Sequence, residues 1–202
     1  MATQHDLFGN MPQSAPVLAA APDGLTLCGR IVGDSAARDI TGLIDTCGLA
    51  PFRYGQWAGK RLTRSFGWHY DFAGGGLRKE EQMPVWLVDL RMCVANAFDE
   101  EASRFEQALL IRYDPGAGIG WHRDRPVFDT ILGVSFGASA ELRLRRRKTC
   151  GFDRATVKLD AGRAYRLKGP ARELWEHSIL PQTDTRWSIS FRSLRDGAPP
   201  VR

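Results

Sequence analysis

The chain has 202 residues, 43% of them hydrophobic, a length and composition that suit one domain with one sizeable core. No apolar run approaches the roughly 20 residues that a membrane helix requires, which argues against a membrane protein. The net charge of +5 is uneven: residues 1–101 carry 9 basic and 12 acidic residues, whereas residues 102–202 carry 19 and 11. A basic half indicates an anionic partner such as nucleic acid, although the solvated face of a strand explains the run Arg143–Lys148 equally well.

Two features of the sequence indicate a cytoplasmic protein. Residues 1–24 contain a short apolar patch with no basic segment before it, so we interpret them as a flexible tail and not as a signal peptide. Residues 25–202 form the single predicted domain. The four cysteines are widely spaced and include no CxxC pair, which argues against a disulfide framework or a thiolate zinc site.

The first part of this domain mixes predicted helices and short strands. Residues 34–48, DSAARDITGLIDTCG, predict an amphipathic helix with an Asp/Ser cap, a glycine at its end and apolar residues at helical spacing. Short strands are expected at PFRY and KRLTRSFGWHYDF, followed by a flexible polar loop over residues 73–82. A second helix is expected over residues 83–98, where Pro84 suits the first turn.

After Ser103 the sequence changes to short runs rich in β-branched and aromatic residues, separated by turn signals such as DPGAG, FGAS and DAG. Regular short strands after two helices predict an α+β fold, a β-sandwich or jelly roll with the helices packed on one sheet. The segment RYDPGAGIGWHRD, residues 112–124, lies within this pattern. Its glycines predict the turn of a hairpin and not a phosphate-binding loop, because a strand pattern and not a helix follows them.

The pair His122 and Asp124 is the first candidate for a metal site. On a strand, residues two apart point to the same face. His177 lies at the head of the later strand candidate EHSIL, and a jelly roll could bring that strand beside the first. Two imidazoles and one carboxylate can hold Fe(II) and leave positions open for a co-substrate and oxygen. The ordinary alternative is a surface histidine hydrogen-bonded to a nearby aspartate.

The last predicted strand, RWSISFR, carries a second unusual pattern. Arg186, Ser188, Ser190 and Arg192 share one face, and three apolar residues share the other. Two inward-facing arginines are costly to bury unless they meet an anion, and a guanidinium group can bind a carboxylate through two hydrogen bonds. A small dicarboxylate is therefore the expected ligand, with the exposed face of an edge strand as the alternative.

In order and spacing, RYDPGAGIGWHRD, the later histidine and RWSISFR resemble the AlkB family of Fe(II)/2-oxoglutarate-dependent dioxygenases. The resemblance is firm from about Ala108 to Leu194, looser over FGWHYDF and MPVWL, and absent before about Phe52. It implies a double-stranded β-helix (jelly-roll) catalytic core over residues 106–195, with helices and a nucleotide-recognition lid over residues 25–105. The implied cofactors are Fe(II), 2-oxoglutarate as co-substrate and O2.

The resemblance also assigns roles to single residues. The implied metal ligands are His122, Asp124 and His177. The implied co-substrate-binding residues are Tyr113, Arg186, Ser188 and Arg192. Ser188 falls where many members have asparagine, and Ile111 falls where well-studied members have a co-substrate-binding asparagine, so one contact with the co-substrate is expected to be missing. No protein acid or base beyond the iron site is implied, because the cofactor carries the chemistry.

The implied activity is oxidative dealkylation of nucleic-acid bases, in DNA alkylation repair or RNA demethylation, by a monomeric enzyme. Three aromatic residues alternate along the predicted lid strand: Trp68, Tyr70 and Phe72. They would stack on a flipped base, unless they are simply core residues. Arg123 and Arg125 flank the metal motif and would contact phosphate. DNA-repair members have an acidic residue soon after the metal aspartate, whereas this chain has Arg125 and Pro126, so base recognition is expected to differ.

Two other functions stay open at the level of the sequence. The same chemistry would serve a hydroxylase or demethylase of a protein or a small molecule. A jelly-roll binding protein with an idle metal motif would not be an enzyme at all.

Overall fold

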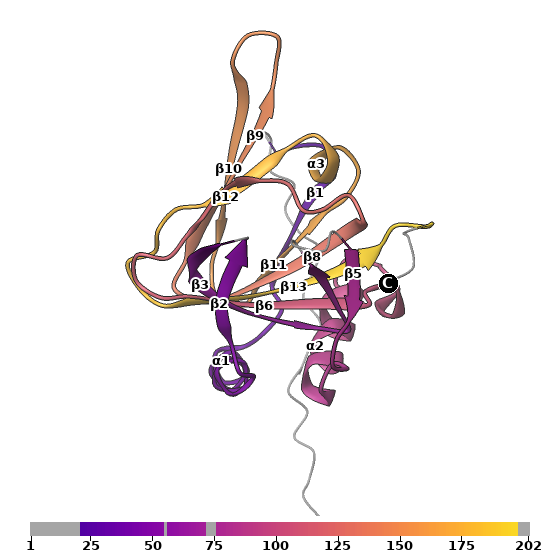
Figure 1. Ribbon diagram of the computed structural model, residues 1–202, viewed down its shortest axis with the longest axis vertical. Helices are drawn as coiled ribbons and strands as arrows, with labels where there is room; N and C mark the ends of the chain where they lie inside the picture. The colour runs from indigo at the N-terminus through magenta and orange to yellow at the C-terminus, as the bar shows by residue number, and fades with distance from the viewer. Residues whose placement is uncertain (1–20, 55, 72–75, 198–202) are drawn as a thin grey trace, which may run out of the picture.

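The fold is built from two antiparallel β-sheets, shown in Figure 1 by the computed structural model, which describes residues 21–54, 56–71 and 76–197. Among these residues the large sheet has seven strands, in spatial order β1 (Leu25–Arg30), β11 (Arg163–Leu167), β8 (Phe128–Gly137), β13 (Arg186–Leu194), β6 (Gln107–Tyr113), β3 (Trp57–Phe66) and β2 (Ala50–Tyr54). The small sheet contains β10 (Phe152–Leu159), β9 (Ala140–Arg147), β12 (Glu176–Ile179) and β7 (Ile119–His122), in that order. A separate hairpin pairs β4 (Trp68–Asp71) with β5 (Gly76–Lys79). The predicted jelly roll is confirmed.

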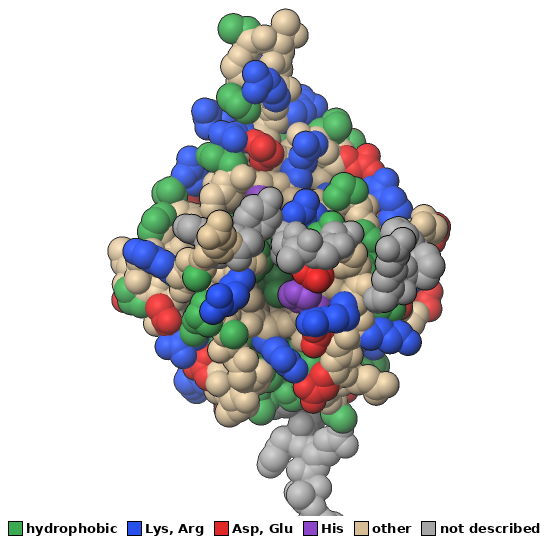
Figure 2. All heavy atoms as spheres, in the orientation of Figure 1, with side chains coloured by type: hydrophobic (Ala, Val, Ile, Leu, Met, Phe, Trp, Pro, Cys, Tyr) green, Lys and Arg blue, Asp and Glu red, His purple; other side chains and the backbone are tan. Residues whose placement is uncertain are grey.

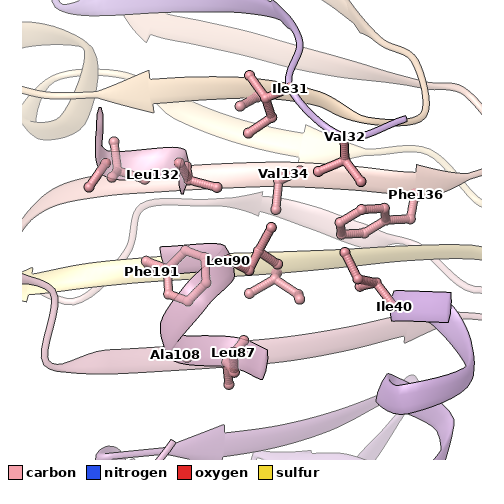
Figure 3. Packing of buried hydrophobic residues seen from close by; sticks show 14 of the residues in the cluster. Ile31, Val32, Ile40, Leu87, Leu90, Ala108, Leu132, Val134, Phe136 and Phe191 are labelled. Carbon is pink, nitrogen blue, oxygen red and sulfur yellow. The ribbon is translucent and has the colours of Figure 1, made fainter. Parts of the chain in front are cut away.

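Two helices, α1 (Asp34–Thr46) and α2 (Val85–Asn96), cover the face of the large sheet that points away from the small sheet (Figure 1). Their buried side chains form one apolar cluster with the central strands, in which Ile40, Leu87 and Leu90 meet Phe136 and Phe191 (Figure 3). Each such side chain, fully buried, stabilises the fold by about 1.5–3 kcal/mol. The prediction that the helices pack on one sheet is therefore confirmed.

Strand β13 has two different faces, and this difference decides where a site can form. Ile189 and Phe191 are fully buried in the cluster beneath the helices. Because side chains alternate along a strand, Arg186, Ser188 and Arg192 point instead into the space between the sheets, where they line a cavity. The strand is paired on one side with β8 and on the other with β6. The arginines therefore belong to a central strand, which rules out an exposed edge.

A second apolar cluster fills part of the space between the two sheets. Leu142 and Leu159 of the small sheet meet Ile131 and Leu167 of the large sheet, with Trp175 packed beside them. Trp175 follows a short helix, α3 (Pro170–Glu173). Beside this cluster the sheets enclose the cavity that contains the candidate site.

Two predictions about loops are wrong. The polar segment 73–82 was expected to be a loop, but Gly76–Lys79 forms β5, in which Leu77 is buried and pairs with Tyr70.

The DPGAG turn forms, with Ala117 N donating to Asp114 O at 2.8 Å, but it does not close a hairpin. Strand β6 before the turn belongs to the large sheet and β7 after it belongs to the small sheet. The turn therefore carries the chain across the sandwich, which is what places residues of both strands on one cavity.

The ends of the predicted segments also differ in detail. Helix α1 starts after Gly33 with no side-chain cap bond and ends at Thr46, before the expected glycine. Residues 1–20 of the predicted tail and Phe72 lie outside the described residues. The backbone carbonyl oxygen of Asp23, a residue of the predicted tail, accepts a hydrogen bond from Ala171 N of α3 at 2.8 Å. No helix in the described part of the chain is both long and apolar enough to cross a membrane.

Candidate active site

A cavity of about 640 Å³ lies between the two sheets. Its walls come from β2, β3, β6, β8, β11 and β13 of the large sheet, from β7, β9, β10 and β12 of the small sheet, and from β4 of the separate hairpin. The predicted site residues on its lining are Tyr70, Tyr113, His122, Arg123, Asp124, Arg125, His177, Arg186, Ser188 and Arg192. Trp68 is not among them. In Figure 2 a histidine is visible near the centre of the face shown, with lysine and arginine side chains around it.

His122, Asp124 and His177 come together at this cavity. Strands β7 and β12 are neighbours, and His122 and His177 are direct partners in their antiparallel register. Their ring centroids lie 4.3 Å apart. The candidate ligand atoms of the three residues all lie within 4.8 Å of one another. Asp124 lies two residues beyond the end of β7, so the expectation that both members of the HxD pair stand on one strand is wrong.

The loop that carries Asp124 is held by α3. Arg172 is buried, and its Nη2 donates to the carbonyl oxygens of Arg125 and Phe128, the latter at 2.8 Å. Arg123 Nη1 donates to Glu173 O at 3.0 Å. A loop tied at both ends in this way holds its carboxylate in one position, although it has no strand ladder of its own.

The protonation states of the three residues suit a divalent cation. Burial, followed by the neighbouring imidazole of His122, lowers the pKa of His177 to about 3, so this ring is neutral at pH 7. His122 Nδ1 lies 2.9 Å from Gly120 O, and a proton shared there leaves Nε2 free as a ligand. Burial opposes ionisation of Asp124, but Arg192 and the two histidines hold its pKa well below the usual range. Two neutral imidazoles and one carboxylate are the donor set of non-haem Fe(II) oxygenases.

Arg192 fixes the orientation of the Asp124 carboxylate. Its Nη2 lies 2.6 Å from Asp124 Oδ1, and its Nη1 donates to Gln107 Oε1 at 3.1 Å. The second oxygen, Oδ2, lies 3.4 Å from His177 Nε2. One carboxylate oxygen is therefore held by the arginine, and the other faces the His177 ring.

Arg186 is buried beside the cavity, with part of its guanidinium unpaired by the described residues. The side chain is only 2% exposed. Its Nε donates to Ser135 Oγ at 3.1 Å, and its guanidinium lies 5.1 Å from the centroid of the Tyr113 ring. Nη1 is buried and has no hydrogen-bond partner among the described residues. An unsatisfied charged donor in the interior is costly, and a carboxylate bound beside Ser188 would satisfy it. The residues present thus fit a dicarboxylate co-substrate.

The predicted substrate-binding residues do not all reach the cavity. Arg125 places its guanidinium 4.9 Å from the centroid of the Tyr70 ring, and both residues line the cavity. Arg123 lines it too, but is bonded to α3 as described. Trp68 instead donates from Nε1 to Glu106 Oε2 at 3.3 Å, and Lys79 lies 5.7 Å from its ring.

Several cavity residues have no counterpart in the sequence predictions. They are Arg61, Gln107, Trp121 and Tyr165. Trp121 directly precedes His122, and this position is the one feature of the sequence that could have identified it as a cavity residue. Arg61 is stacked on Phe52, 3.9 Å from the ring centroid, and nothing in its sequence context distinguishes it from a surface arginine.

The comparisons with known proteins agree with this geometry. Residues 55–195 match the family model described as the 2OG-Fe(II) oxygenase superfamily. The solved structure of OsALKBH1 superposes with a TM-score of 0.68 at 16% sequence identity, covering 88% of this chain and 100% of that one. The search of curated proteins found no match. The family's cofactors are Fe(II), 2-oxoglutarate and O2, and the His-Asp-His cluster fits the iron. The chain is therefore an Fe(II)/2-oxoglutarate-dependent dioxygenase with an AlkB-like fold, and it belongs to the 2OG-Fe(II) oxygenase superfamily.

Proposed function

We propose that this enzyme oxidatively removes alkyl groups from nucleic-acid bases, as DNA alkylation repair or RNA demethylation. The observation that carries the proposal is a surface of alternating arginine and aromatic side chains that starts at the cavity and continues along the β9–β10 hairpin. We call it the Arg–aromatic surface, and it consists of Trp121, Arg143, Arg145, Phe152 and Arg154.

The side chains of the Arg–aromatic surface are stacked on one another. The guanidinium groups of Arg143 and Arg145 lie 4.8 and 4.5 Å from the centroid of the Trp121 ring. Arg145 of β9 also lies 4.7 Å from the centroid of the Phe152 ring, and Arg154, on the same strand as Phe152, lies 5.6 Å from that centroid. Phe152 is 36% exposed although it is a large apolar residue. Exposed rings between arginines suit bases and phosphates, because every base has a face that stacks and every phosphate is an anion.

The position of this surface relates it to the active site. Trp121 lines the cavity and directly precedes His122. Strands β9 and β10 form the hairpin that projects from the body in Figure 1, and lysine and arginine side chains gather on and below it in Figure 2. A strand of nucleic acid lying on this surface would have one base close to the cavity, where Tyr70 and Arg125 border the space available to it.

Part of the basic run is neutralised within the protein. Arg145 is paired with Glu176 at 2.6 Å, and Arg146 is paired with Asp153 at 2.8 Å. Arg143 and Arg154 have no ion-pair partner among the described residues. We therefore assign phosphate contacts first to these two arginines, and give Arg123, which is bonded to α3, a smaller part.

The proposed roles at the centre follow from the contacts already described. His122, Asp124 and His177 hold Fe(II), and Arg186 binds the distal carboxylate of 2-oxoglutarate, with Tyr113 and Ser188 beside it. Arg192 keeps the Asp124 carboxylate oriented. When bound, iron and 2-oxoglutarate supply the oxidation together with O2, and an N-methyl group leaves the base as formaldehyde.

An activity screen tests the proposal directly. Enzyme supplied with Fe(II), 2-oxoglutarate and ascorbate should release formaldehyde from DNA or RNA oligonucleotides containing N1-methyladenine or N3-methylcytosine, with a matching loss of mass. His122→Ala and Arg186→Ala should each abolish this turnover. If the enzyme decarboxylates 2-oxoglutarate but demethylates none of the oligonucleotides, the nucleic-acid substrate is refuted, and a protein or small molecule takes its place.

Location and oligomeric state are part of the same proposal. The four cysteines, Cys28, Cys47, Cys93 and Cys150, are free thiols in the structure, as suits a reducing cytoplasm. We propose a monomeric cytoplasmic enzyme, which size-exclusion chromatography and cell fractionation would test.

A further inference from the structure

Tyr165 occupies the co-substrate side of the cavity, although no motif singles it out. It stands on β11 and lines the cavity with Arg186, Ser188 and Arg192. In the register of the sheet its direct partner on β8 is Gly133, and Gly133 in turn is the partner of Ser190 on β13. A side chain that passes over Gly133 therefore approaches the strand that carries both arginines.

The glycine shows that the Tyr165 ring takes this path. A Cβ atom at position 133 would lie 2.2 Å from Cζ and 2.5 Å from the hydroxyl oxygen of Tyr165. Such distances are far inside van der Waals contact, so any residue but glycine at 133 would displace the ring. The phenol thus crosses the neighbouring strand and presents its hydroxyl to the space between the sheets.

The surroundings of the phenol are those of the proposed co-substrate site. The charged and titratable groups that act on it are Arg186, Asp124, Tyr113 and Arg192. Burial, offset in part by Arg186, raises the pKa of Tyr165 to about 12, so the hydroxyl keeps its proton and can donate a hydrogen bond. The hydrogen bonds found within the described part of the chain include none from this hydroxyl.

We propose that Tyr165 is a co-substrate-binding residue whose hydroxyl donates a hydrogen bond to the carboxylate held by Arg186. This inference rests on the proposed role of Arg186. Arg186 Nη1 is buried and lacks an acceptor among the described residues, and the Tyr165 hydroxyl, which makes none of the hydrogen bonds found there, lines the same cavity. A carboxylate has enough lone pairs for both. On β6 the cavity is lined by Ile111, whose side chain can give no hydrogen bond. Tyr165 would supply from β11 the contact that the sequence predicts to be missing at Ile111.

A binding measurement without any nucleic acid tests this inference. The Fe(II)-loaded protein is titrated anaerobically with 2-oxoglutarate, and complex formation is followed by its visible charge-transfer absorption and by calorimetry. Tyr165→Phe removes the hydroxyl alone and should weaken binding about tenfold, as expected for one hydrogen bond to a charged group. Fe(II) binding should be unchanged. The matched ligand is 2-oxobutanoate, which has the same keto acid but no distal carboxylate, and the variant should bind it as the wild type does.

Three outcomes would overturn the inference. In the first, Tyr165→Phe binds 2-oxoglutarate with an affinity within twofold of the wild type. In the second, Tyr165→Phe loses affinity for both keto acids equally, which would mean that the ring only packs against its neighbours. In the third outcome, Arg186→Met binds 2-oxoglutarate as tightly as the wild type, which would mean that no carboxylate lies near Tyr165. A second variant, Gly133→Ala, should displace the ring and weaken binding of 2-oxoglutarate more than that of 2-oxobutanoate. Because the titration contains no oligonucleotide, its failure is distinct from failure of the proposed nucleic-acid substrate.

Discussion

Replacing Arg186 with methionine should separate the function of this residue from its contribution to stability. The guanidinium is buried with Nη1 unpaired, and among the described residues its hydrogen-bond partner is Ser135. Two hydrogen bonds from a charged donor to a carboxylate are worth about 3–6 kcal/mol. Their loss should weaken 2-oxoglutarate binding by about 10²–10⁴-fold.

The stability of the ligand-free protein should change little in the same variant. Methionine fills a similar volume and removes a buried charge that has no ion-pair partner among the described residues, a change that is often neutral or favourable for stability. The bond to Ser135 Oγ is lost, at a cost of about 1 kcal/mol. For a chain of this size the Tm of ligand-free protein should therefore shift by less than about 4 °C.

Thermal denaturation with and without 2-oxoglutarate, in Fe(II)-loaded protein, measures both effects. The wild type at a ligand concentration 100 times Kd should gain about 2.7 kcal/mol from binding, whereas Arg186→Met should gain almost nothing. A variant that is still stabilised by 2-oxoglutarate to the same extent would refute the assignment of Arg186. A ligand-free Tm that falls by 10 °C or more would show that the guanidinium stabilises the ligand-free fold, which contradicts the prediction.

Three further predictions concern other parts of the molecule. His177 has its pKa lowered from 6.5 to about 3, so between these values the unfolded chain binds a proton that the folded, metal-free protein excludes. Stability should therefore fall as the pH drops from about 6.5 towards 3, and His177→Asn should flatten this dependence in urea denaturation; an equal slope would contradict it. Arg143→Gln should lower the slope of the logarithm of the binding constant for a single-stranded oligonucleotide against the logarithm of salt concentration by about 1. Arg38→Gln, at an exposed position of α1, should leave this slope unchanged. Equal slopes in both variants would argue against the Arg–aromatic surface. Leu90→Ala empties a fully buried position under the large sheet and should destabilise the protein by about 2–5 kcal/mol, which chemical denaturation would detect; a loss below 1 kcal/mol would mean that this cluster is loosely packed.

The sequence predicted the candidate centre better than the local structure around it. His122, Asp124, His177 and the alternating face of β13 could be found because a metal and a buried dicarboxylate require rare residue types at fixed positions. The strand order could not be found in this way. Nothing in DPGAG distinguishes a hairpin turn from a crossing between sheets, since both need a reversal and a glycine with positive φ, here Gly116 at 82°.

Other residues were missed because their roles depend on neighbours distant in the chain. Tyr165 reads as an ordinary strand residue until Gly133 is placed beside it by the β8–β11 register. The role of Trp121 becomes visible only when Arg143 and Arg145, on a different strand, are found to contact its ring. The sequence predicts a loop at β5 because the strand begins at the last of three consecutive glycines, and its single buried side chain, Leu77, gives no periodic pattern.

The direct pairing of His122 with His177 has a consequence for the architecture of the small sheet. Strand β7 is a four-residue strand at the edge of that sheet, and its ladder is to β12 alone. A slip of one residue in this register would turn one imidazole to the opposite face of the sheet. An ion bound by both rings would therefore hold the two strands in this register in addition to its role in the reaction. Amide hydrogens of Ile119–His122 should accordingly exchange more slowly in the iron-loaded enzyme than in the apoprotein.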